Sequence, residues 1–268
     1  MIFTVLGSTG YIGSHLVRYL ESLGHEVKTP DRSARSLEKY GKLGHVIYAI
    51  GLTGDFRQHP EATIEAHVSI LQQLIHKADF DSWLYLSSTR IYNKLPATTA
   101  AREETSLVVS PGLDNIYNLS KLLGESLCLA GNDPDIRIAR LSNVYGPGQS
   151  SNSFLGSIIN DLKKTGSVTI GESPESSKDY ISIDDILRLL TDISTKGKHQ
   201  IYNVASGHSV SHEQIAKTLR NMGYSVTFAQ NAPTRRFPDI NTERLQHEFD
   251  PASASLLEAL PYLLRNTL

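Results

Sequence analysis

Two side chains four residues apart, Tyr117 and Lys121, have the types and spacing needed to exchange a proton with a substrate oxygen. On a helix, residues i and i+4 lie on one face, so a lysine ammonium can approach the phenol and favour its ionised form. Lowering the pKa of a free tyrosine from about 10 to about 7 takes roughly 4 kcal/mol of differential stabilisation. A phenol adjusted in this way is a general acid or base. Because the spacing also arises by chance in a chain with 12 tyrosines, its place in the fold must support the assignment.

A glycine-rich segment near the N-terminus predicts a phosphate-binding turn. Residues 7–13 read GSTGYIG, with glycine at every third position, directly after an apolar run. Glycine lets the backbone turn tightly and approach a pyrophosphate, while the N-terminus of the following helix supplies N–H groups and partial positive charge. Asp31 lies about 20 residues further on, where an acidic side chain meets the ribose hydroxyls of NAD. Arg32 and Arg35 could equally hold the 2′-phosphate of NADP, or form a surface ion pair with Asp31. We expect NAD, with NADP as the alternative.

The elements that must position these residues follow a βαβ pattern. Short β-branched runs alternate with amphipathic helical stretches, which is typical of a parallel sheet covered on both faces. The predicted fold class is therefore α/β, a Rossmann-type doubly wound parallel sheet. The predicted strands cover residues 2–6, 25–28, 45–50, 83–87 and 136–140, and the predicted helices cover residues 12–23, 64–78 and 117–129.

The second half of the chain has a different pattern. A helix is predicted over residues 154–164 and a short strand over residues 167–170, and Asp184 marks a further helix start. The run Ser211-His212-Glu213-Gln214 fits a capping box and predicts a helix that ends near residue 222. The chain is thus divided into a dinucleotide-binding domain over residues 1–150 and a smaller α/β substrate lobe over residues 151–268, part of which could return to the sheet.

The composition restricts the class of protein. The chain has 268 residues, of which 40% are hydrophobic and 20% charged, with a formal net charge of −2. These values exclude disorder, collagen and coiled coil, and the lack of a basic block argues against nucleic acid as a partner. We expect no membrane span, because no run approaches about 18 apolar residues, and no metal site, because the ten histidines lack ligand spacing. The lone Cys128 and the lack of a targeting signal predict a buried thiol and a cytoplasmic protein.

Four further segments extend the pattern. Residues 83–93 read WLYLSSTRIYN, residues 117–121 read YNLSK, residues 140–148 read RLSNVYGPG and residues 178–185 read KDYISIDD. Together with the glycine-rich segment, in this order and spacing, they resemble the extended short-chain dehydrogenase/reductases, the NAD-dependent epimerase/dehydratase family that includes UDP-galactose 4-epimerase. The resemblance covers nearly the whole chain. It implies hydride transfer between a nicotinamide and a carbon of a nucleotide-diphosphate sugar, beside proton exchange with a tyrosine.

The resemblance also implies roles for individual residues. It implies a catalytic triad of Ser88, Tyr117 and Lys121, in which Ser88 bonds the substrate oxygen and Lys121 also holds the ribose. Ser87 and Thr89 are weaker candidates than Ser88, since a serine cluster could simply cap the next turn. Cofactor contacts are implied at Gly7, Thr9, Gly10, Tyr11, Ile12, Gly13, Asp31, Arg32, Ile50, Gly51, Ser87, Tyr117 and Lys121. Substrate contacts are implied at Ser88, Thr89, Asn143, Lys178 and Arg236.

Several positions depart from the family pattern. The segment between Asp31 and the strand at residues 45–50 is too short for the strand and helix that the family fits there, so we expect the usual edge strand to be missing, with a short helix at residues 34–41. Lys178 stands where the family has arginine. Lysine keeps the positive charge but lacks the bidentate fork of the guanidinium. Residues 88–92 lack the adjacent Asp-Glu pair of the sugar 4,6-dehydratases, so dehydration is disfavoured. Thr89 occupies the position of the cysteine that GDP-fucose synthases use, so 3,5-epimerisation lacks its usual acid. His67 replaces an asparagine, and we expect only a packing role for it.

The favoured function is NAD(P)-dependent oxidoreduction at C4 of a nucleotide sugar. Two reactions share the triad: C4 epimerisation through a 4-keto intermediate with NAD retained, and one-way reduction of a 4-keto sugar with the cofactor exchanged. The segment expected to contact the adenine of the cofactor is shortened, which should weaken retention of the cofactor and so favours reduction. The alternatives are a non-catalytic dinucleotide sensor on the same fold and a reductase of a small carbonyl compound. The family also suggests a homodimer through the helices around Leu71 and Leu122.

Overall fold

The structure is a computed structural model that describes residues 1–266 except residues 32, 35, 76, 251 and 253. Within these residues the main sheet has six parallel strands in the order β2-β1-β3-β4-β5-β9. They are β1 (Ile2–Leu6), β2 (Glu26–Lys28), β3 (His45–Tyr48), β4 (Ser82–Ser88), β5 (Ile136–Leu141) and β9 (Ile201–Val204). The central strands are buried apolar runs, as expected for a parallel sheet covered on both faces. The predicted Rossmann-type α/β class is confirmed.

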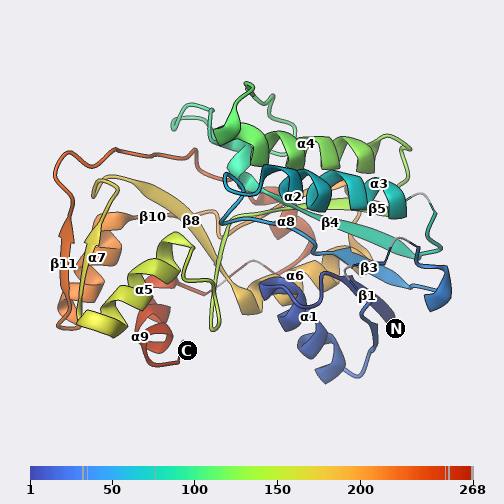
Figure 1. The fold of residues 1–268 in the computed structure, drawn as a ribbon, viewed down its shortest axis with the longest axis horizontal. Coiled ribbons are helices and arrows are strands. Elements are labelled where there is room, and N and C mark those ends of the chain that lie inside the picture. The colour runs from blue at the N-terminus through green and yellow to red at the C-terminus, as the bar shows by residue number, and fades with distance from the viewer. Residues whose placement is uncertain (32, 35, 76, 251, 253, 267–268) are drawn as a thin grey trace.

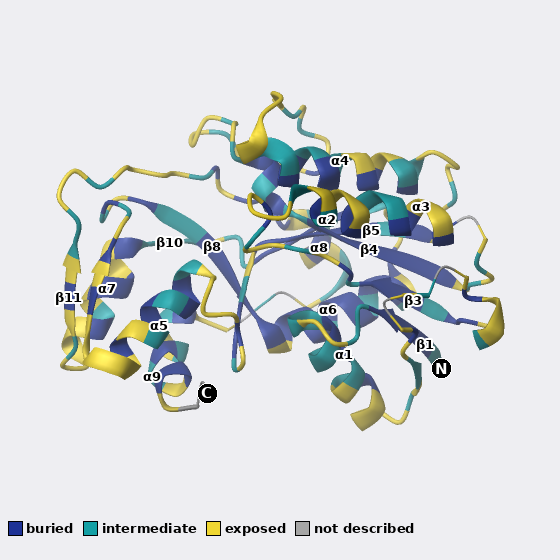
Figure 2. Ribbon diagram, in the orientation of Figure 1, coloured by how far each residue is buried: buried dark blue, intermediate teal, exposed yellow. Residues whose placement is uncertain are grey.

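Helices cover both faces of the main sheet, and their inner sides are buried (Figures 1 and 2). On one face, α1 (Tyr11–Ser22) packs against α6 (Ile183–Lys196), and residues such as Leu16 and Ile186 share one core with the sheet. The other face carries α2 (Pro60–Ile64), α3 (Ile70–Ile75) and α4 (Ile116–Leu129). Here Leu71 and Cys128 lie in a second core, and Cys128 is a buried free thiol as expected. One turn between α2 and α3, residues Glu65–Ser69, is π-helical.

Part of the second half of the chain forms a smaller group of elements at one end of the sheet, whereas α6, β9 and α8 lie with the main sheet (Figure 1). A three-stranded sheet has the order β10-β8-β6, and β7 pairs with β11 in a parallel ribbon. The predicted capping box is confirmed, because Ser211 and Gln214 each bond the other's backbone N–H. The bounds are β6 (Asn143–Tyr145), α5 (Phe154–Thr165), β7 (Ser167–Ile170), β8 (Ser177–Ser182), β10 (Ser209–Ser211), α7 (His212–Asn221), β11 (Ser225–Phe228), α8 (Glu243–Glu248) and α9 (Leu256–Asn266).

The main sheet ends at β2, which confirms the expectation of a missing edge strand for the described residues. Between residues 31 and 45 the described part of the chain forms only a single turn of 3-10 helix, Glu38–Tyr40. Lys28 secures this segment, since its ammonium donates to the carbonyl oxygens of Tyr40 (2.9 Å) and Lys42 (2.7 Å). A short edge strand capped by a lysine presents few unpaired backbone groups to another chain.

A buried ion pair joins α4 to the centre of the sheet. The Arg140 guanidinium lies 2.7 Å from a carboxylate oxygen of Glu125, and both side chains are about 5% exposed. Glu125 also accepts from the Ser87 hydroxyl at 2.5 Å, and Arg140 donates to the Tyr92 hydroxyl at 2.6 Å. Because both charges are paired and bonded on several sides, their burial is tolerated. This network fixes how α4 lies on β4 and β5.

Arg140→Met should be strongly destabilising, because it leaves the Glu125 carboxylate buried without its cation. We expect the free energy of unfolding to fall by about 3–5 kcal/mol in urea titrations. Lys196→Met is the control: it removes an exposed ion pair with Asp192 and should change stability little. Equal stability of Arg140→Met and the wild type would contradict a structural role for the network.

Candidate active site

The glycine-rich turn follows β1 and admits only glycine at two positions. Gly7 has a φ of +86°, and a Cβ there would lie 2.8 Å from the backbone of Ala49. A Cβ at Gly13 would lie 2.1 Å from the carbonyl oxygen of Gly7. Gly10 precedes α1, with its N–H bonded to Gly7 at 3.0 Å, and no side chain caps the helix. The first N–H groups of α1 therefore face outward from a close turn, the arrangement that fits a dinucleotide pyrophosphate.

The other predicted cofactor residues lie at the same carboxyl edge of the sheet. Thr9 is exposed at the turn, and Tyr11 and Ile12 are half-buried at the start of α1. The Tyr11 hydroxyl is buried and has no hydrogen-bond partner among the described residues. Ile50 and Gly51 follow the end of β3, and Gly51 is close to Lys121, since a Cβ at Gly51 would lie 3.7 Å from the Lys121 ammonium.

Asp31 lies at the exposed end of β2. Its carboxylate accepts hydrogen bonds from the hydroxyl and the backbone N–H of Ser33, and these bonds hold its pKa below the usual value. Asp31 is therefore ionised at neutral pH and turned toward its own loop. The predicted contact at Arg32 and the alternative at Arg35 lie outside the described residues.

The structure brings Ser88, Tyr117 and Lys121 together where α4 crosses the end of β4. Tyr117 is 5% exposed, and its phenol lies close enough to the side chains of Ser88 and Thr53 for both to lower its pKa. Lys121 lies one turn deeper on α4, where its ammonium donates to the Leu86 carbonyl oxygen at 2.8 Å. The three side chains thus share one buried strip between α4 and β4.

The neighbouring serine and threonine have other partners. The Ser87 hydroxyl donates to Glu125, and the Thr89 hydroxyl donates to the Leu141 carbonyl oxygen at 3.3 Å. Ser88 is the member of the cluster whose hydroxyl meets Tyr117, although it also accepts from the Arg90 N–H at 3.2 Å as the cap of the following turn. The structure therefore separates Ser88 from the two weaker candidates.

Burial sets the protonation states of the two α4 residues. Burial raises the pKa of Tyr117, and the bonds from Ser88 and Thr53 and the charge of Arg90 oppose this shift only in part. Burial also lowers the pKa of Lys121 to about 7, against the opposing effect of Glu125. With the protein's own groups alone, Tyr117 keeps its proton at neutral pH, and the cation that acts on the phenol is Arg90. The expected ionising effect of Lys121 is not seen.

His67 was expected only to pack, yet it lies directly beside the triad. It is fully buried in the π-helical turn, with its ring edge-on to Tyr117 at 5.3 Å between centroids. Nε2 accepts from the Leu52 N–H at 3.3 Å, so the proton lies on Nδ1, which donates to the Ser120 hydroxyl at 2.8 Å. Burial, together with the charge of Lys121, lowers the pKa of His67 to about 2. A permanently neutral imidazole thus ties the loop after β3 to α4.

An aromatic and cationic cluster covers the other side of Tyr117, and the sequence analysis missed it. Phe56 is 1% exposed, with its ring 5.6 Å from that of Tyr117. The guanidinium of Arg90 lies 4.8 Å from the Phe56 ring and 5.5 Å from the Tyr117 ring. Arg57 lies on the Phe56 ring as well, and is paired with Asp114. A charged residue directly after the Ser-Ser-Thr strand end was the available signal for Arg90.

The predicted substrate residues gather around β8 and the segment beside it. The Asn143 amide donates to the Asp179 carbonyl oxygen at 2.8 Å. Lys178 is mostly buried, with its ammonium 3.2 Å from Glu172 and 3.9 Å from the centre of the Phe154 ring. Burial lowers the pKa of Lys178, and Glu172 opposes the shift.

The later cationic segment lies against the same strand. Arg236 is exposed and pairs through its backbone with Ser177 at the start of β8. Its neighbour Arg235 lies 3.7 Å from Glu172. Lys178, Arg235 and Arg236 therefore form one cationic region at the β8 side, with the Glu172 carboxylate beside Lys178 and Arg235.

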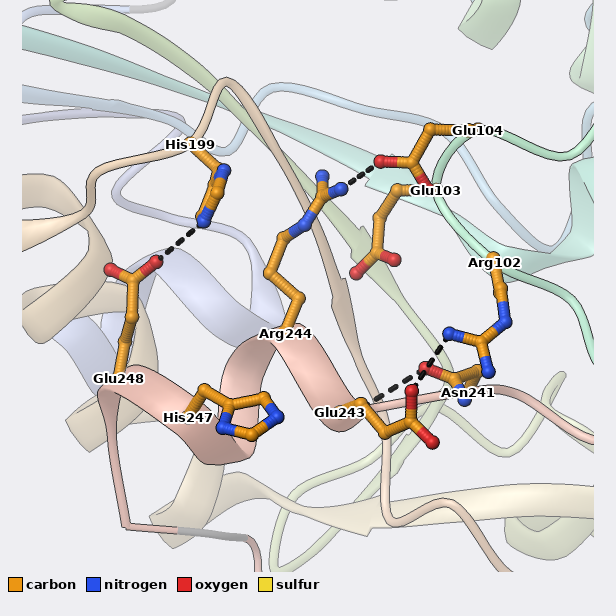
Figure 3. A pocket seen from close by; sticks show the side chains of 9 residues that line it. All are labelled: Arg102, Glu103, Glu104, His199, Asn241, Glu243, Arg244, His247 and Glu248. Carbon is orange, nitrogen blue, oxygen red and sulfur yellow. Dashed lines mark hydrogen bonds and ion pairs between the residues drawn. The ribbon is translucent and has the colours of Figure 1, made fainter.

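A pocket elsewhere on the surface contains none of these residues (Figure 3). It lies beside α8, and its side chains contact one another: Arg244 is paired with Glu104, Arg102 is paired with Glu243, and His199 lies 3.1 Å from Glu248. Among the described residues, no group of three or more His, Cys, Asp or Glu side chains is placed to hold a metal. Nor does any helix in the described part of the chain have the length and apolar character needed to cross a membrane.

The buried Lys121 should make stability depend on pH. Its pKa is about 7 in the folded chain against 10.5 ordinarily, so the unfolded chain binds more protons between these values. The free energy of unfolding of the wild type should therefore rise, relative to that of Lys121→Met, as the pH increases from about 7 to about 10. Urea titrations at several pH values measure this difference. Lys94→Met, which removes an exposed charge, is the control. If the stability difference between the wild type and Lys121→Met changes with pH as little as that of the control does, the lowered pKa of Lys121 is contradicted.

Comparisons with known proteins find relatives that match the chain in sequence and in fold. The dTDP-4-dehydro-6-deoxy-D-allose reductase of a Streptomyces species is 26% identical, over 79% of this chain and 78% of its own length. The structure of RMD from Pseudomonas aeruginosa complexed with NADPH has a TM-score of 0.81 and 22% identity, covering 99% of this chain and 98% of that one.

A second solved structure is equally similar in fold. A variant of the UDP-glucuronic acid 4-epimerase of Bacillus cereus, in complex with UDP-4-deoxy-4-fluoro-glucuronic acid and NAD, has a TM-score of 0.84 and 19% identity, over 99% of this chain and 98% of that one. The model of the NAD dependent epimerase/dehydratase family matches residues 3–205. Together with the glycine turn and the α4 strip, this match shows that the chain belongs to the NAD dependent epimerase/dehydratase family.

Proposed function

We propose that the chain is an NAD(P)-dependent oxidoreductase that acts at C4 of a nucleotide-diphosphate sugar, with Ser88, Tyr117 and Lys121 as its catalytic residues. The observation that carries this proposal is the buried phenol of Tyr117, which keeps its proton and lies beside Ser88 at the carboxyl end of β4. In Rossmann-type sheets, ligands bind at this edge. The glycine turn lies at the same edge, so a dinucleotide there would reach toward Tyr117.

Each residue of the strip has a defined task in this chemistry. The bound dinucleotide supplies or accepts the hydride at the substrate carbon. Ser88 and Tyr117 converge on one point and would both bond the oxygen attached to that carbon. Tyr117 gives its proton to that oxygen during reduction and takes it back during oxidation. Lys121, close to Gly51 and able to carry a charge near neutral pH, would hold the ribose hydroxyls.

Two features favour reduction over epimerisation. A phenol whose pKa is raised by burial is suited to donate a proton to a carbonyl oxygen, which is the reductive direction. The sheet also ends at β2, so that the cofactor would meet less protein at its adenine end and could exchange between turnovers. Epimerisation with a retained cofactor is the second candidate, because the same three residues serve it.

The charged side chains near the two ends of the site guide the choice of cofactor and of substrate. An ionised Asp31 favours the ribose hydroxyls of NAD and repels a 2′-phosphate, so NAD is proposed, with NADP as the alternative. The cationic region of Lys178, Arg235 and Arg236 suits the diphosphate of a nucleotide sugar. A homodimer, if formed through α4, would use its outer side, where Leu123 is 51% exposed, because Leu71 is buried inside the subunit.

Tyr117→Phe should abolish most of the turnover. Removing the proton donor should lower kcat by about 10²–10⁴-fold while binding of NADH or NADPH stays unchanged. Oxidation of the reduced dinucleotide by a nucleotide-linked 4-keto sugar measures kcat, and fluorescence titration measures binding. Tyr262→Phe, on the exposed side of α9, is the control and should keep full activity. A wild type that binds dinucleotide but turns over no 4-keto or epimerisable sugar nucleotide would favour the sensor.

Arg236→Ala should separate a sugar-nucleotide substrate from a small carbonyl compound. Losing one cation from the diphosphate region should raise KM by about ten-fold or more for a diphosphate-linked substrate, with kcat nearly retained. Arg18→Ala, which removes an exposed cation from α1, should leave KM unchanged. An Arg236→Ala enzyme with wild-type KM would count against the diphosphate and in favour of a small substrate.

A further inference from the structure

Arg90 is held in a defined position at the catalytic end of β4. It lies two residues after Ser88, in the single 3-10 turn Thr89–Tyr92 whose N-terminus Ser88 caps. Its guanidinium lies against the adjacent rings of Phe56 and Tyr117, at 4.8 and 5.5 Å from their centres, which are 5.6 Å from each other. The N–H groups on the edge turned away from the two rings are left to find other partners.

That edge has no anionic partner in the protein. No ion pair or side-chain hydrogen bond involves the Arg90 guanidinium among the described residues, whereas Arg140, also in the core of the domain, is paired with Glu125. The charges nearest to it are mostly of its own sign, since Arg57 and Arg235 face it, and Asp114 is already bonded to Arg57. A half-buried cation among cations is unfavourable unless an anion joins it.

The place of Arg90 indicates where such an anion would be. The cations proposed for the diphosphate, Lys178, Arg235 and Arg236, lie at the β8 side. Arg90 faces Arg235 and Lys178 of this region and also lies against the ring of Tyr117, the residue proposed to meet the reacting oxygen. Because Arg90 is the member of this set that contacts Tyr117, we take the anion that it holds to be attached to the sugar, next to the reacting carbon.

We propose that Arg90 is a specificity residue that binds a carboxylate on the carbon beside C4, so that the substrate is a nucleotide-linked uronic acid. This inference rests on the proposed function and specifies its substrate class. A planar carboxylate matches the planar, bidentate edge of a guanidinium, and the pair would be shielded from water by Phe56. A neutral CH₂OH group at the same carbon would leave the guanidinium without a charge partner.

Binding to the full chain saturated with NAD tests the proposal. Calorimetry would compare UDP-glucuronic acid with UDP-glucose, and GDP-mannuronic acid with GDP-mannose, since the base is open. In the pair that binds, the wild type should prefer the acid sugar by about ten-fold or more. Arg90→Met, which keeps the apolar stem against the rings, should lose that preference by weakening binding of the acid sugar alone. Arg90→Lys should keep part of it, because it retains the charge without the fork.

Arg57→Met is the matched control, since it removes the cation on the same Phe56 ring that already has Asp114 as its partner. It should leave the preference intact. An equal loss of both sugars in Arg90→Met, or no preference for the acid in the wild type, would overturn this inference and leave the proposed function standing. Binding of none of the four nucleotide sugars would overturn the proposed function as well.

Discussion

The site depends on one buried polar stripe on the underside of α4. Tyr117, Lys121 and Glu125 follow one another at four-residue intervals, so all three point at the end of β4, and each is about 5% exposed or less. Polar groups buried to this degree must each find a partner. The partners are Ser88, the Leu86 carbonyl oxygen, and Ser87 with Arg140, respectively. A shift of α4 by one turn would leave all of them unpaired at once, so the stripe determines the register of the helix on the sheet.

Much of this arrangement could be predicted from the sequence. The apolar runs predicted the ends of the strands within one or two residues. Glycine at every third position identified the turn, in which a Cβ at Gly13 would clash with the carbonyl oxygen of Gly7. The positions of Ser88, Tyr117 and Lys121 followed from motifs at the end of one strand and the start of one helix. These features are local, and local patterns carry strong signals.

The parts that could not be predicted depend on contacts between distant segments. Thr53, Phe56 and His67 come to Tyr117 from the loop and helix after β3, and their individual residue types give no sign of it. The effect of Lys121 on the phenol was misjudged, because its bond to a backbone carbonyl oxygen depends on the depth of the helix over the sheet. A return of the second lobe to the sheet was foreseen, but the strand β9 that makes it was not located, since four such residues have no distinctive flanking pattern.

The π-helical turn at Glu65–Ser69 has a consequence for chains of slightly different length. A π-turn contains one residue more than the α-helix around it needs, and each residue of an α-helix adds about 100° of rotation. Deleting one residue there would restore regular helix while α3 stays anchored in its core, and would turn α2 and the loop with Phe56 around the helix axis. Insertions and deletions far from the triad could thereby change which side chains face Tyr117 without a single substitution among the catalytic residues.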